Sequence, residues 1–327
     1  MLAIALLAAS PDHAAAQREA ACPAPPQPVV DLDLARFYAD EAGSVVDAAK
    51  QKEHDTAVAP LTLFVRTVAD LADKSHTRSS PAARAEAARC ALGWLTTWAK
   101  SGALTGRMAS RQAEYQRKWD FGGIALAYLK LKAAAPSADR TLIEPWLIRL
   151  ADASRAFFDD PARTRNNHWY WLGLGLAATA LATNSDRHWA MARGIMTDAA
   201  RDIAGEGTLP KEMERKSRAL FYHVFAMTPL VVMAELAASR GEDWYALGGG
   251  ALHRLVALCH RGLADPSQFD AQTGVAQERP VNARAGWLQL YERRFPGRLA
   301  PPHPVVAEGN RWLGGRVEVL SGVLGRR

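Results

Sequence analysis

Two short segments of the sequence bring together side chains that could bind and process an acidic substrate. The first, RTRNNHWYW (residues 163–171), sets two asparagines and a histidine at the start of an uncharged run of 15 residues, Trp169–Thr183. Asparagine is favoured at helix N-caps, so Asn166 or Asn167 is expected to begin a helix there. A helix N-terminus presents free N–H groups and a positive dipole, which makes Asn167 and His168 candidates for holding a carboxylate.

The second segment is LPKEMERKSRALFYHVFAMTPL (residues 209–230). Arg215 and Tyr222 are seven residues apart, which corresponds to two turns of helix and predicts that they share one face. Arg218 and Tyr222 stand at i and i+4 and should be neighbours. A purely structural alternative stays open, in which the charged residues form a solvated first turn of the helix and Tyr222 is a core residue.

The charge balance narrows the kind of partner. The 327-residue chain has a net charge of +6 and a pI of about 9.3, which favours nucleic acid, anionic lipid or acidic polysaccharide. The basic residues are scattered among acidic ones, which disfavours nucleic acid. His253 and His260 could share a helix face but have no partners at metal-ligand spacing, so no metal site and no cofactor are expected.

The N-terminal residues resemble an export signal. Leu2–Ala9 is apolar, too short to span a bilayer, and Ala14–Ala16 offers a small-residue cleavage site. Residues 1–21 are therefore predicted to be a signal peptide and leader, which places the protein in the periplasm. In an oxidising compartment Cys22 and Cys90 could be bridged, leaving Cys259 as a buried thiol.

The rest of the chain has a helical pattern. Apolar residues recur at spacings of three and four, and proline- or glycine-containing turns divide the chain into roughly ten helices without a linker. This predicts an all-α fold of antiparallel helix pairs in a single domain, residues 22–327. The uncharged run at 169–183 predicts a helix buried all round, with Gly173 and Gly175 where a neighbour approaches closely. Inner and outer helix layers, as in an α/α toroid with a cleft at one mouth, would explain such a helix.

The motifs also carry a family resemblance. RNNHWYW resembles the NNHSYW motif of bacterial alginate lyases, the poly(mannuronate) lyases of polysaccharide lyase family 5. Residues 209–230 are similar to that family's LPxExxRxxRAxxYHxxxxxPL segment, and further counterparts begin at residues 90, 117 and 312 in the same order. The resemblance implies an incomplete α/α toroid, periplasmic location, and metal-independent β-elimination of polyuronates. It implies catalytic roles for Asn167, His168, Arg215 and Tyr222.

These residue types suit β-elimination. The reaction removes the C5 proton of a uronate, and neutralising the adjacent carboxylate stabilises the developing negative charge. Asn167 and Arg215 are predicted to do this. Tyr222, with a pKa lowered by Arg215 and Arg218, is predicted to be the general acid and the favoured base. His168 is a carboxylate binder or an alternative base.

Sugar binding also calls for aromatic platforms and further cations. The predicted substrate-binding residues are Lys118, Trp119, Tyr128, Trp169, Tyr170, Trp171 and Arg218. Two positions depart from the family pattern. Trp169 replaces the motif's serine, and Ala57 replaces a lysine near the substrate entrance.

The leading prediction is a lyase acting on mannuronate-rich alginate. A lyase preferring glucuronan or mixed polyuronates is the first alternative, because glucuronate shares the C4/C5 stereochemistry of mannuronate. A non-catalytic binder of anionic polysaccharide is the second. No nucleic acid or membrane partner is expected, and the protein is expected to be a monomer.

Overall fold

Helices make up nearly all regular structure in this computed structural model, which describes residues 22–41, 43–279, 287–300 and 309–325. The described α-helices, in chain order, are α1 (Ala48–Ala57), α2 (Ala59–Thr77), α3 (Pro81–Lys100), α4 (Arg111–Leu131), α5 (Ser137–Ala156), α6 (Asn167–Thr183), α7 (Asp186–Asp202), α8 (Pro210–Met213), α9 (Ala219–Ala238), α10 (Leu247–Ala264), α11 (Ser267–Thr273), α12 (Trp287–Arg294) and α13 (Val317–Leu324). Within these ranges there are isolated β-bridges but no strand. The predicted all-α class is confirmed, and the helices beyond the expected ten are short. The predicted signal segment, residues 1–21, lies outside the described residues.

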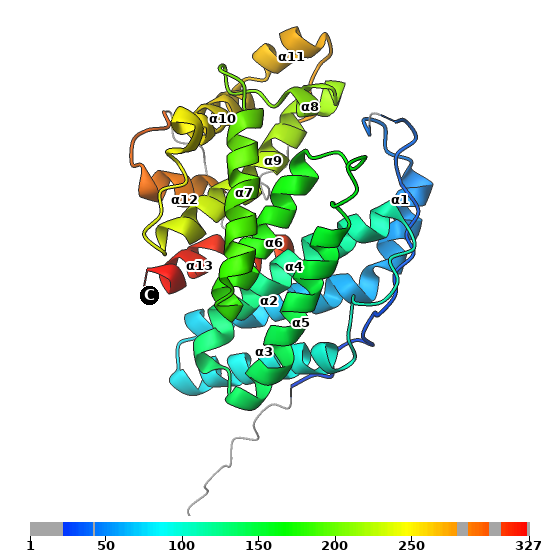
Figure 1. The fold of residues 1–327 in the computed structure, drawn as a ribbon, viewed down its shortest axis with the longest axis vertical. Coiled ribbons are helices and arrows are strands. Elements are labelled where there is room, and N and C mark those ends of the chain that lie inside the picture. The colour runs from blue at the N-terminus through cyan, green and yellow to red at the C-terminus, as the bar shows by residue number, and fades with distance from the viewer. Residues whose placement is uncertain (1–21, 42, 280–286, 301–308, 326–327) are drawn as a thin grey trace, which may run out of the picture.

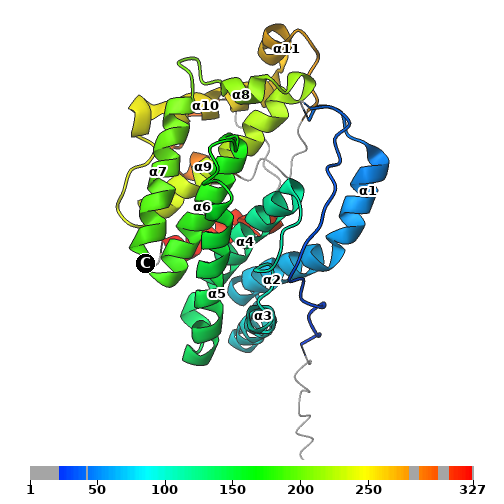
Figure 2. The ribbon, with the colours of Figure 1, turned by 45° about the vertical axis from the view of Figure 1, so that its right-hand side comes forward.

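The long helices form two layers (Figures 1 and 2). The inner helices α2, α4, α6 and α9 pack side by side in that order. Each inner helix also packs against an adjacent helix of the chain in the outer layer: α3 on α2, α5 on α4, α7 on α6 and α10 on α9. This is the predicted incomplete α/α toroid.

Helix α6 is the buried centre of the bundle. It packs against α4, α5, α7 and α9, and Figure 1 shows it between these elements. All of its residues except His168 and Thr183 are buried, which confirms the prediction from the uncharged run. Asn166 is its N-cap, and its side-chain oxygen accepts a hydrogen bond from the backbone N–H of His168 at 3.2 Å.

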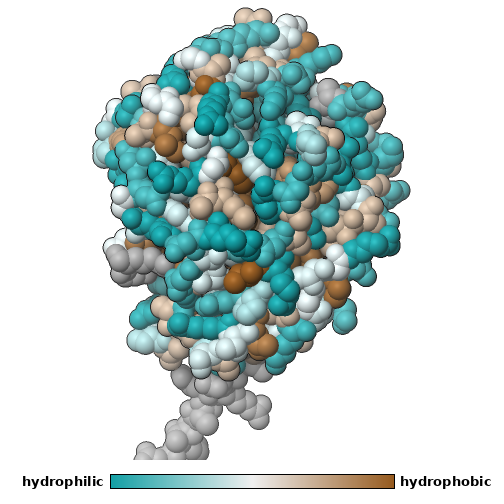
Figure 3. Space-filling model, in the orientation of Figure 1, coloured by the Kyte–Doolittle hydropathy of each residue, from teal (hydrophilic) through white to brown (hydrophobic). Residues whose placement is uncertain are grey.

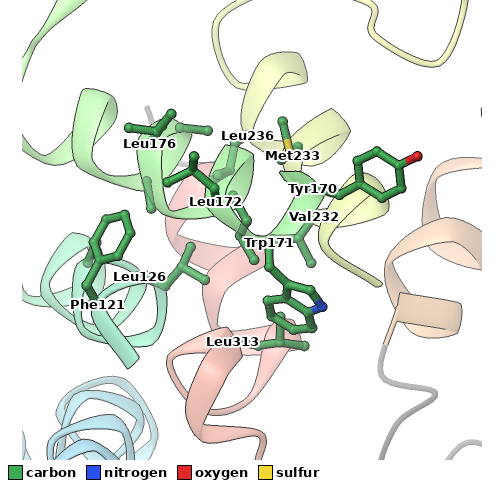
Figure 4. Packing of buried hydrophobic residues seen from close by; sticks show 14 of the residues in the cluster. Phe121, Leu126, Tyr170, Trp171, Leu172, Leu176, Val232, Met233, Leu236 and Leu313 are labelled. Atoms are coloured by element: carbon green, nitrogen blue, oxygen red, sulfur yellow. The ribbon is translucent and has the colours of Figure 1, made fainter. Parts of the chain in front are cut away.

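Close helix approach explains the glycines of α6. A Cβ atom at Gly175 would lie 2.3 Å from the ring of Phe121 on α4, and one at Gly173 would lie 2.8 Å from Met233 on α9. Figure 4 shows Phe121 and Met233 on different sides of α6. Larger residues would therefore separate the inner helices and enlarge or distort the core.

The C-terminal region returns to the inner layer and is fastened there by a buried charge pair. Lys130 of α4 is ion-paired with Asp73 of α2 and also donates to the carbonyl of Gly314 at 2.7 Å. The Asp73 carboxylate in turn accepts from the backbone N–H of Arg316 at 2.7 Å. A Cβ at Gly123 would lie 2.1 Å from the carbonyl oxygen of Arg311, so the short helix η4 (Arg311–Leu313) lies directly on α4.

The N-terminal segment is fixed along the outer helix α3. Cys22 and Cys90 form a disulfide, and the indole N–H groups of Trp94 and Trp98 donate to the carbonyls of Pro23 and Pro26. Cys259 is a buried free thiol. From this anchor the chain runs to residues 36–41 and 43–46, which Figure 2 shows on the same side of the molecule as α1.

One described segment, Lys216–Ala238, is long and apolar enough to cross a bilayer, but 89% of its apolar window is buried inside the protein. It is the core helix α9 with its preceding turn. The face shown in Figure 3 is mainly hydrophilic, and its apolar residues lie in small separate groups.

Candidate active site

A pocket of about 600 Å³ opens where the N-terminal segment faces the starts of α4, α6 and α9. Among the described residues, five arginines line it, against two carboxylates, those of Glu41 and Asp55. The arginines come from segments far apart in the chain: Arg36, Arg111, Arg215, Arg218 and Arg311. The pocket therefore favours an anionic ligand.

The asparagines at the start of α6 are placed differently from the prediction. Asn166 lines the pocket, whereas Asn167 is fully buried behind it. The Asn167 amide and its backbone N–H both donate to the same carboxylate oxygen of Glu212, each at 2.9 Å. A direct hydrogen bond from Asn167 to the substrate, as predicted, does not fit this arrangement, because its amide is turned toward Glu212.

Glu212 is a residue that the sequence analysis missed. Its second carboxylate oxygen lies 3.7 Å from the guanidinium of Arg215, so Glu212 links the start of α6 to the segment before α9. Burial raises the pKa of this carboxyl group, against the opposing effect of Asn167 and Arg215. Glu212 belongs to the LPKE segment, but its hydrogen-bond partner Asn167 lies 45 residues away in sequence, so no local pattern connects them.

Arg215 and Tyr222 meet, although not on one continuous helix. Arg215 precedes a short 3-10 turn, Lys216 adopts a left-handed φ of 50°, and α9 begins only at Ala219. The prediction of two regular helical turns was wrong here because the left-handed residue interrupts the helix. The guanidinium of Arg215 nevertheless lies 4.6 Å from the centre of the Tyr222 ring.

Tyr222 has a hydrogen-bond partner that the sequence analysis missed. Its hydroxyl lies 2.8 Å from that of Tyr38, which accepts a further hydrogen bond from Arg218 at 3.1 Å. Tyr38 comes from the N-terminal segment, 184 residues before Tyr222, and no local sequence pattern connects the two.

The expected lowering of the Tyr222 pKa is wrong. Burial and the adjacent Tyr38 raise the pKa of the Tyr222 hydroxyl, and they outweigh the opposite effect of Arg218 and Arg215. Tyr222 is only 8% exposed, so its phenolate loses most of its hydration. The side chain therefore holds its proton in the unliganded protein.

His168 lines the pocket beside Tyr115, whose ring stacks on it with centroids 3.6 Å apart. Lys118 does not line the pocket. It is 1% exposed and its Nζ lies 2.9 Å from Nδ1 of His168, so the prediction that Lys118 binds substrate directly is wrong.

Burial, together with the positive charges of Lys118, Arg215 and Arg111, lowers the pKa of His168 well below its usual value. The imidazole is therefore neutral.

Of the predicted aromatic platforms, only Trp119 lines the pocket. The others are buried with their polar atoms engaged elsewhere: Tyr128 to Glu144, Trp169 to Asp198, Tyr170 to Asp202 and Trp171 to the carbonyl of Phe225. Their prediction as sugar platforms is wrong because each packs against a neighbouring element. The pocket instead presents Tyr115, Phe221, Phe225 and Trp312 beside Trp119.

The two departures from the family pattern lie outside the pocket lining. Trp169 is buried between α6 and its outer neighbours, with Arg165 over its ring at 4.6 Å. Ala57 is exposed at the end of α1. The expected reshaping of a subsite by Trp169 is therefore not seen, and the five arginines supply positive charge in the absence of a lysine at position 57.

A buried carboxylate, that of Asp120, lies behind the pocket and contacts three of its lining residues. Asp120 accepts hydrogen bonds from Gln116 at 2.6 Å and from the indole of Trp312 at 3.0 Å, and it lies 3.9 Å from Arg311. All three partners line the pocket, whereas Asp120 itself is fully buried. Asp120 thus fixes three pocket groups from behind. Burial raises its pKa from 3.8 to about 6.

This raised pKa predicts a pH-dependent stability. The folded protein binds the Asp120 proton more tightly than the unfolded chain, so this contribution to stability is present below pH 3.8 and is lost as pH rises through about 6. We expect the free energy of unfolding of Asp120→Asn, relative to the original protein, to increase by about 2 to 3 kcal/mol between pH 4 and 7. Urea unfolding at a series of pH values measures it. A constant difference across this range would contradict the assignment.

Among the described residues, no three His, Cys, Asp or Glu side chains gather as a metal-binding group. The groups that meet in the pocket are instead a tyrosine pair, a neutral imidazole, arginines and exposed aromatic faces. Within an α/α toroid, these groups are typical of a protein that binds acidic carbohydrate.

Comparison with known proteins identifies the family. The Alginate lyase family model matches residues 32–269. A polysaccharide lyase of Stenotrophomonas maltophilia is 43% identical over 286 residues, covering 86% of this chain and 85% of its own length. An alginate lyase of Pseudomonas putida is 33% identical over 281 residues, covering 82% and 76%. The chain belongs to the alginate lyase family and is a polysaccharide lyase.

The fold is also that of a solved relative. The crystal structure of alginate lyase A1-III from Sphingomonas species A1 superimposes with a TM-score of 0.78 at 24% identity, covering 91% of this chain and 86% of that one. This likeness independently supports the α/α toroid.

Proposed function

We propose that this lyase acts on mannuronate-rich alginate, that it needs no metal ion, and that Tyr222 exchanges the protons of the reaction. The observation that carries the proposal is the cluster in which Tyr222, Arg215 and His168 line one pocket, with Tyr38 and Arg218 beside Tyr222. Together these side chains supply a proton donor and acceptor, a fixed cation and a neutral hydrogen-bonding ring.

The reaction needs charge stabilisation at the uronate carboxylate. Arg215, which lies over the ring of Tyr222, suits this role as a cation, and His168, which lines the same pocket, suits it as a neutral donor. Asn166, which lines the pocket at the N-terminus of α6, can take part where Asn167 was predicted to act. Neutralising the carboxylate stabilises the negative charge that develops as the C5 proton leaves.

The proton steps can be balanced around Tyr222. The C5–H electron pair forms the C4–C5 double bond while the C4–O bond breaks. The phenolate oxygen of Tyr222 takes the C5 proton and then returns it to the leaving oxygen. In β-mannuronate both atoms lie on the same face of the ring, so one side chain can serve both.

Tyr222 must first lose its own proton to serve as the base. The hydroxyl of Tyr38, at 2.8 Å, offers a relay to solvent, and the nearby Arg215 and Arg218 favour the resulting phenolate. Because the pKa of Tyr222 is raised, the phenolate fraction grows with pH. We therefore expect kcat/KM to increase from neutral toward alkaline pH.

We also propose that the protein acts in the periplasm. The apolar segment Leu2–Ala9 and the small-residue site that follows are typical of an exported chain. A disulfide between Cys22 and Cys90 suits an oxidising compartment.

The substrate assignment is tested with three polymers. The purified protein is incubated with poly-mannuronate, poly-guluronate and glucuronan, with and without a chelator, and the ultraviolet absorbance of the unsaturated product is followed. We expect poly-mannuronate to be cleaved fastest, at a rate unchanged by the chelator. Faster cleavage of glucuronan would establish the alternative specificity. Binding without absorbance for every polymer would identify a non-catalytic binder, and loss of activity with the chelator would refute metal independence.

A further inference from the structure

Lys118 occupies an unusual place for a charged side chain. It is almost completely buried in α4, next to the pocket but outside its lining. Its Nζ lies 4.4 Å from the ring centre of Trp119 and 5.1 Å from that of Tyr115. Within the described residues no carboxylate pairs with it, and its one hydrogen bond is to Nδ1 of His168 at 2.9 Å. A buried lysine without a counter-ion is costly, which points to a purpose beyond stability.

We propose that Lys118 is a positioning residue that fixes the tautomer of His168, so that Nδ1 accepts from Lys118 and the Nε2–H group is presented to the substrate. The inference deepens the proposed function, because it assigns His168 as a hydrogen-bond donor and leaves the base role to Tyr222.

The relative basicity of the two groups supports this direction. Burial lowers the pKa of Lys118 well below its usual value, and burial with nearby positive charges does the same to His168. Because lysine starts as the stronger base by about four pK units in water, an ammonium donating to a neutral imidazole is favoured over an imidazolium donating to an amine. The faces of Trp119 and Tyr115 add cation–π stabilisation to the ammonium form. Arg111 and Arg215 oppose a positive charge on the imidazole itself.

The surrounding contacts fix the ring as well as its proton. Tyr115 stacks on His168 at 3.6 Å with an interplanar angle of 12°, and Trp119 lies 5.4 Å away. With Nδ1 directed to Lys118 and the ring held by stacking, Nε2 is the nitrogen left for the ligand, and it has no hydrogen bond within the described part of the chain. A neutral N–H donor at this point can bind a uronate carboxylate but cannot accept the C5 proton.

The tautomer can be measured without substrate. The protein is produced with ring-¹⁵N histidine, and two-bond ¹⁵N–¹H correlations are recorded near neutral pH. The sequence has nine histidines, and the signals of His168 are identified as those lost in the variant His168→Gln. We expect the Nε2–H form for His168 in the original protein and a mixture of tautomers in Lys118→Met. A Nδ1–H form in the original protein would overturn the proposal, as would an unchanged tautomer in Lys118→Met.

The pH titration of the same signals gives a second readout. Removing the Lys118 charge should raise the pKa of His168, because one of the positive neighbours that lowers it is gone while Arg215 and Arg111 remain. Lys118→Gln provides a second variant if Lys118→Met does not fold. An unchanged titration of His168 in a folded variant would also contradict the proposal.

Kinetics then connect the tautomer to the reaction. We expect kcat/KM on poly-mannuronate to fall by about 10- to 100-fold in Lys118→Met. Lys132→Met is the matched control, since Lys132 directly follows α4 and contacts Leu181 and Asn184 away from the pocket. An absence of lyase activity in the original protein would refute the proposed function, whereas the tautomer of His168 is measured without substrate and would still test the role of Lys118. Failure of the proposed function and failure of the Lys118 proposal are therefore distinguishable.

Discussion

Replacing Tyr222 by phenylalanine is expected to reduce kcat by at least about 10³-fold while the protein still binds polyuronate. The substitution removes the hydroxyl that is proposed to exchange protons with the substrate, and general acid–base groups contribute about 10²- to 10⁴-fold each. Tyr222 is expected in both roles, so the loss should lie near the upper end. The Phe ring keeps the packing against Phe221 and Phe225, so substrate binding should change little.

The measurement is the initial rate of unsaturated product formation, with binding followed separately by calorimetry. Tyr245→Phe is the matched control, because Tyr245 is also a buried tyrosine whose hydroxyl is hydrogen-bonded, in its case to Glu235 at 2.9 Å. We expect that variant to lose stability but keep its kcat. Full turnover by Tyr222→Phe would remove Tyr222 from the mechanism.

Arg215→Gln is expected to lower kcat/KM by about 10²- to 10³-fold, the range found when a preorganised group that stabilises transition-state charge is removed. The side chain of Arg215 is 19% exposed, lines the pocket and lies over the ring of Tyr222. Its loss also leaves Glu212 without its nearest cation. We expect Arg215→Lys to recover only part of the activity, because an ammonium lacks the planar fork that matches a carboxylate.

Steady-state kinetics on poly-mannuronate test this expectation. Arg193→Gln is the control for charge, since Arg193 is 63% exposed on α7, does not line the pocket and is ion-paired with Glu242. It should leave kcat/KM unchanged. Circular dichroism and thermal unfolding of both variants separate a folding defect from a catalytic one. A folded Arg215→Gln enzyme with unchanged kcat/KM would exclude Arg215 as the carboxylate-neutralising cation.

The residue pattern determined the architecture well. Apolar spacing and breakers predicted helices, and the uncharged run of 15 residues predicted a helix without a solvent face, which α6 is. Gly173 and Gly175 indicated close approach, and the ring of Phe121 lies where a Cβ at Gly175 would be. These predictions hold because periodicity and glycine reflect local backbone geometry and burial, which nearby residues control.

The candidate site was predictable only in part. Motif positions indicated His168, Arg215, Arg218 and Tyr222, and all of them line the pocket. Most of the predicted aromatic platforms were wrong. The sequence pattern of a buried helix does not distinguish a tryptophan or tyrosine that faces a pocket from one that packs against a neighbouring helix. Trp119 faces the pocket, whereas Trp169 and Trp171 pack inside the protein.

By itself, then, the sequence determined the all-α class, the buried central helix and the family motifs. Only the tertiary structure decided which groups meet around the reacting hydroxyl. Tyr38 reaches Tyr222 across 184 residues of sequence, and Glu212 turns Asn167 away from the pocket. The pKa of Tyr222 is raised rather than lowered because burial outweighs its two arginine neighbours. Hydration loss and long-range contacts set proton affinity, and both exist only once the chain has folded.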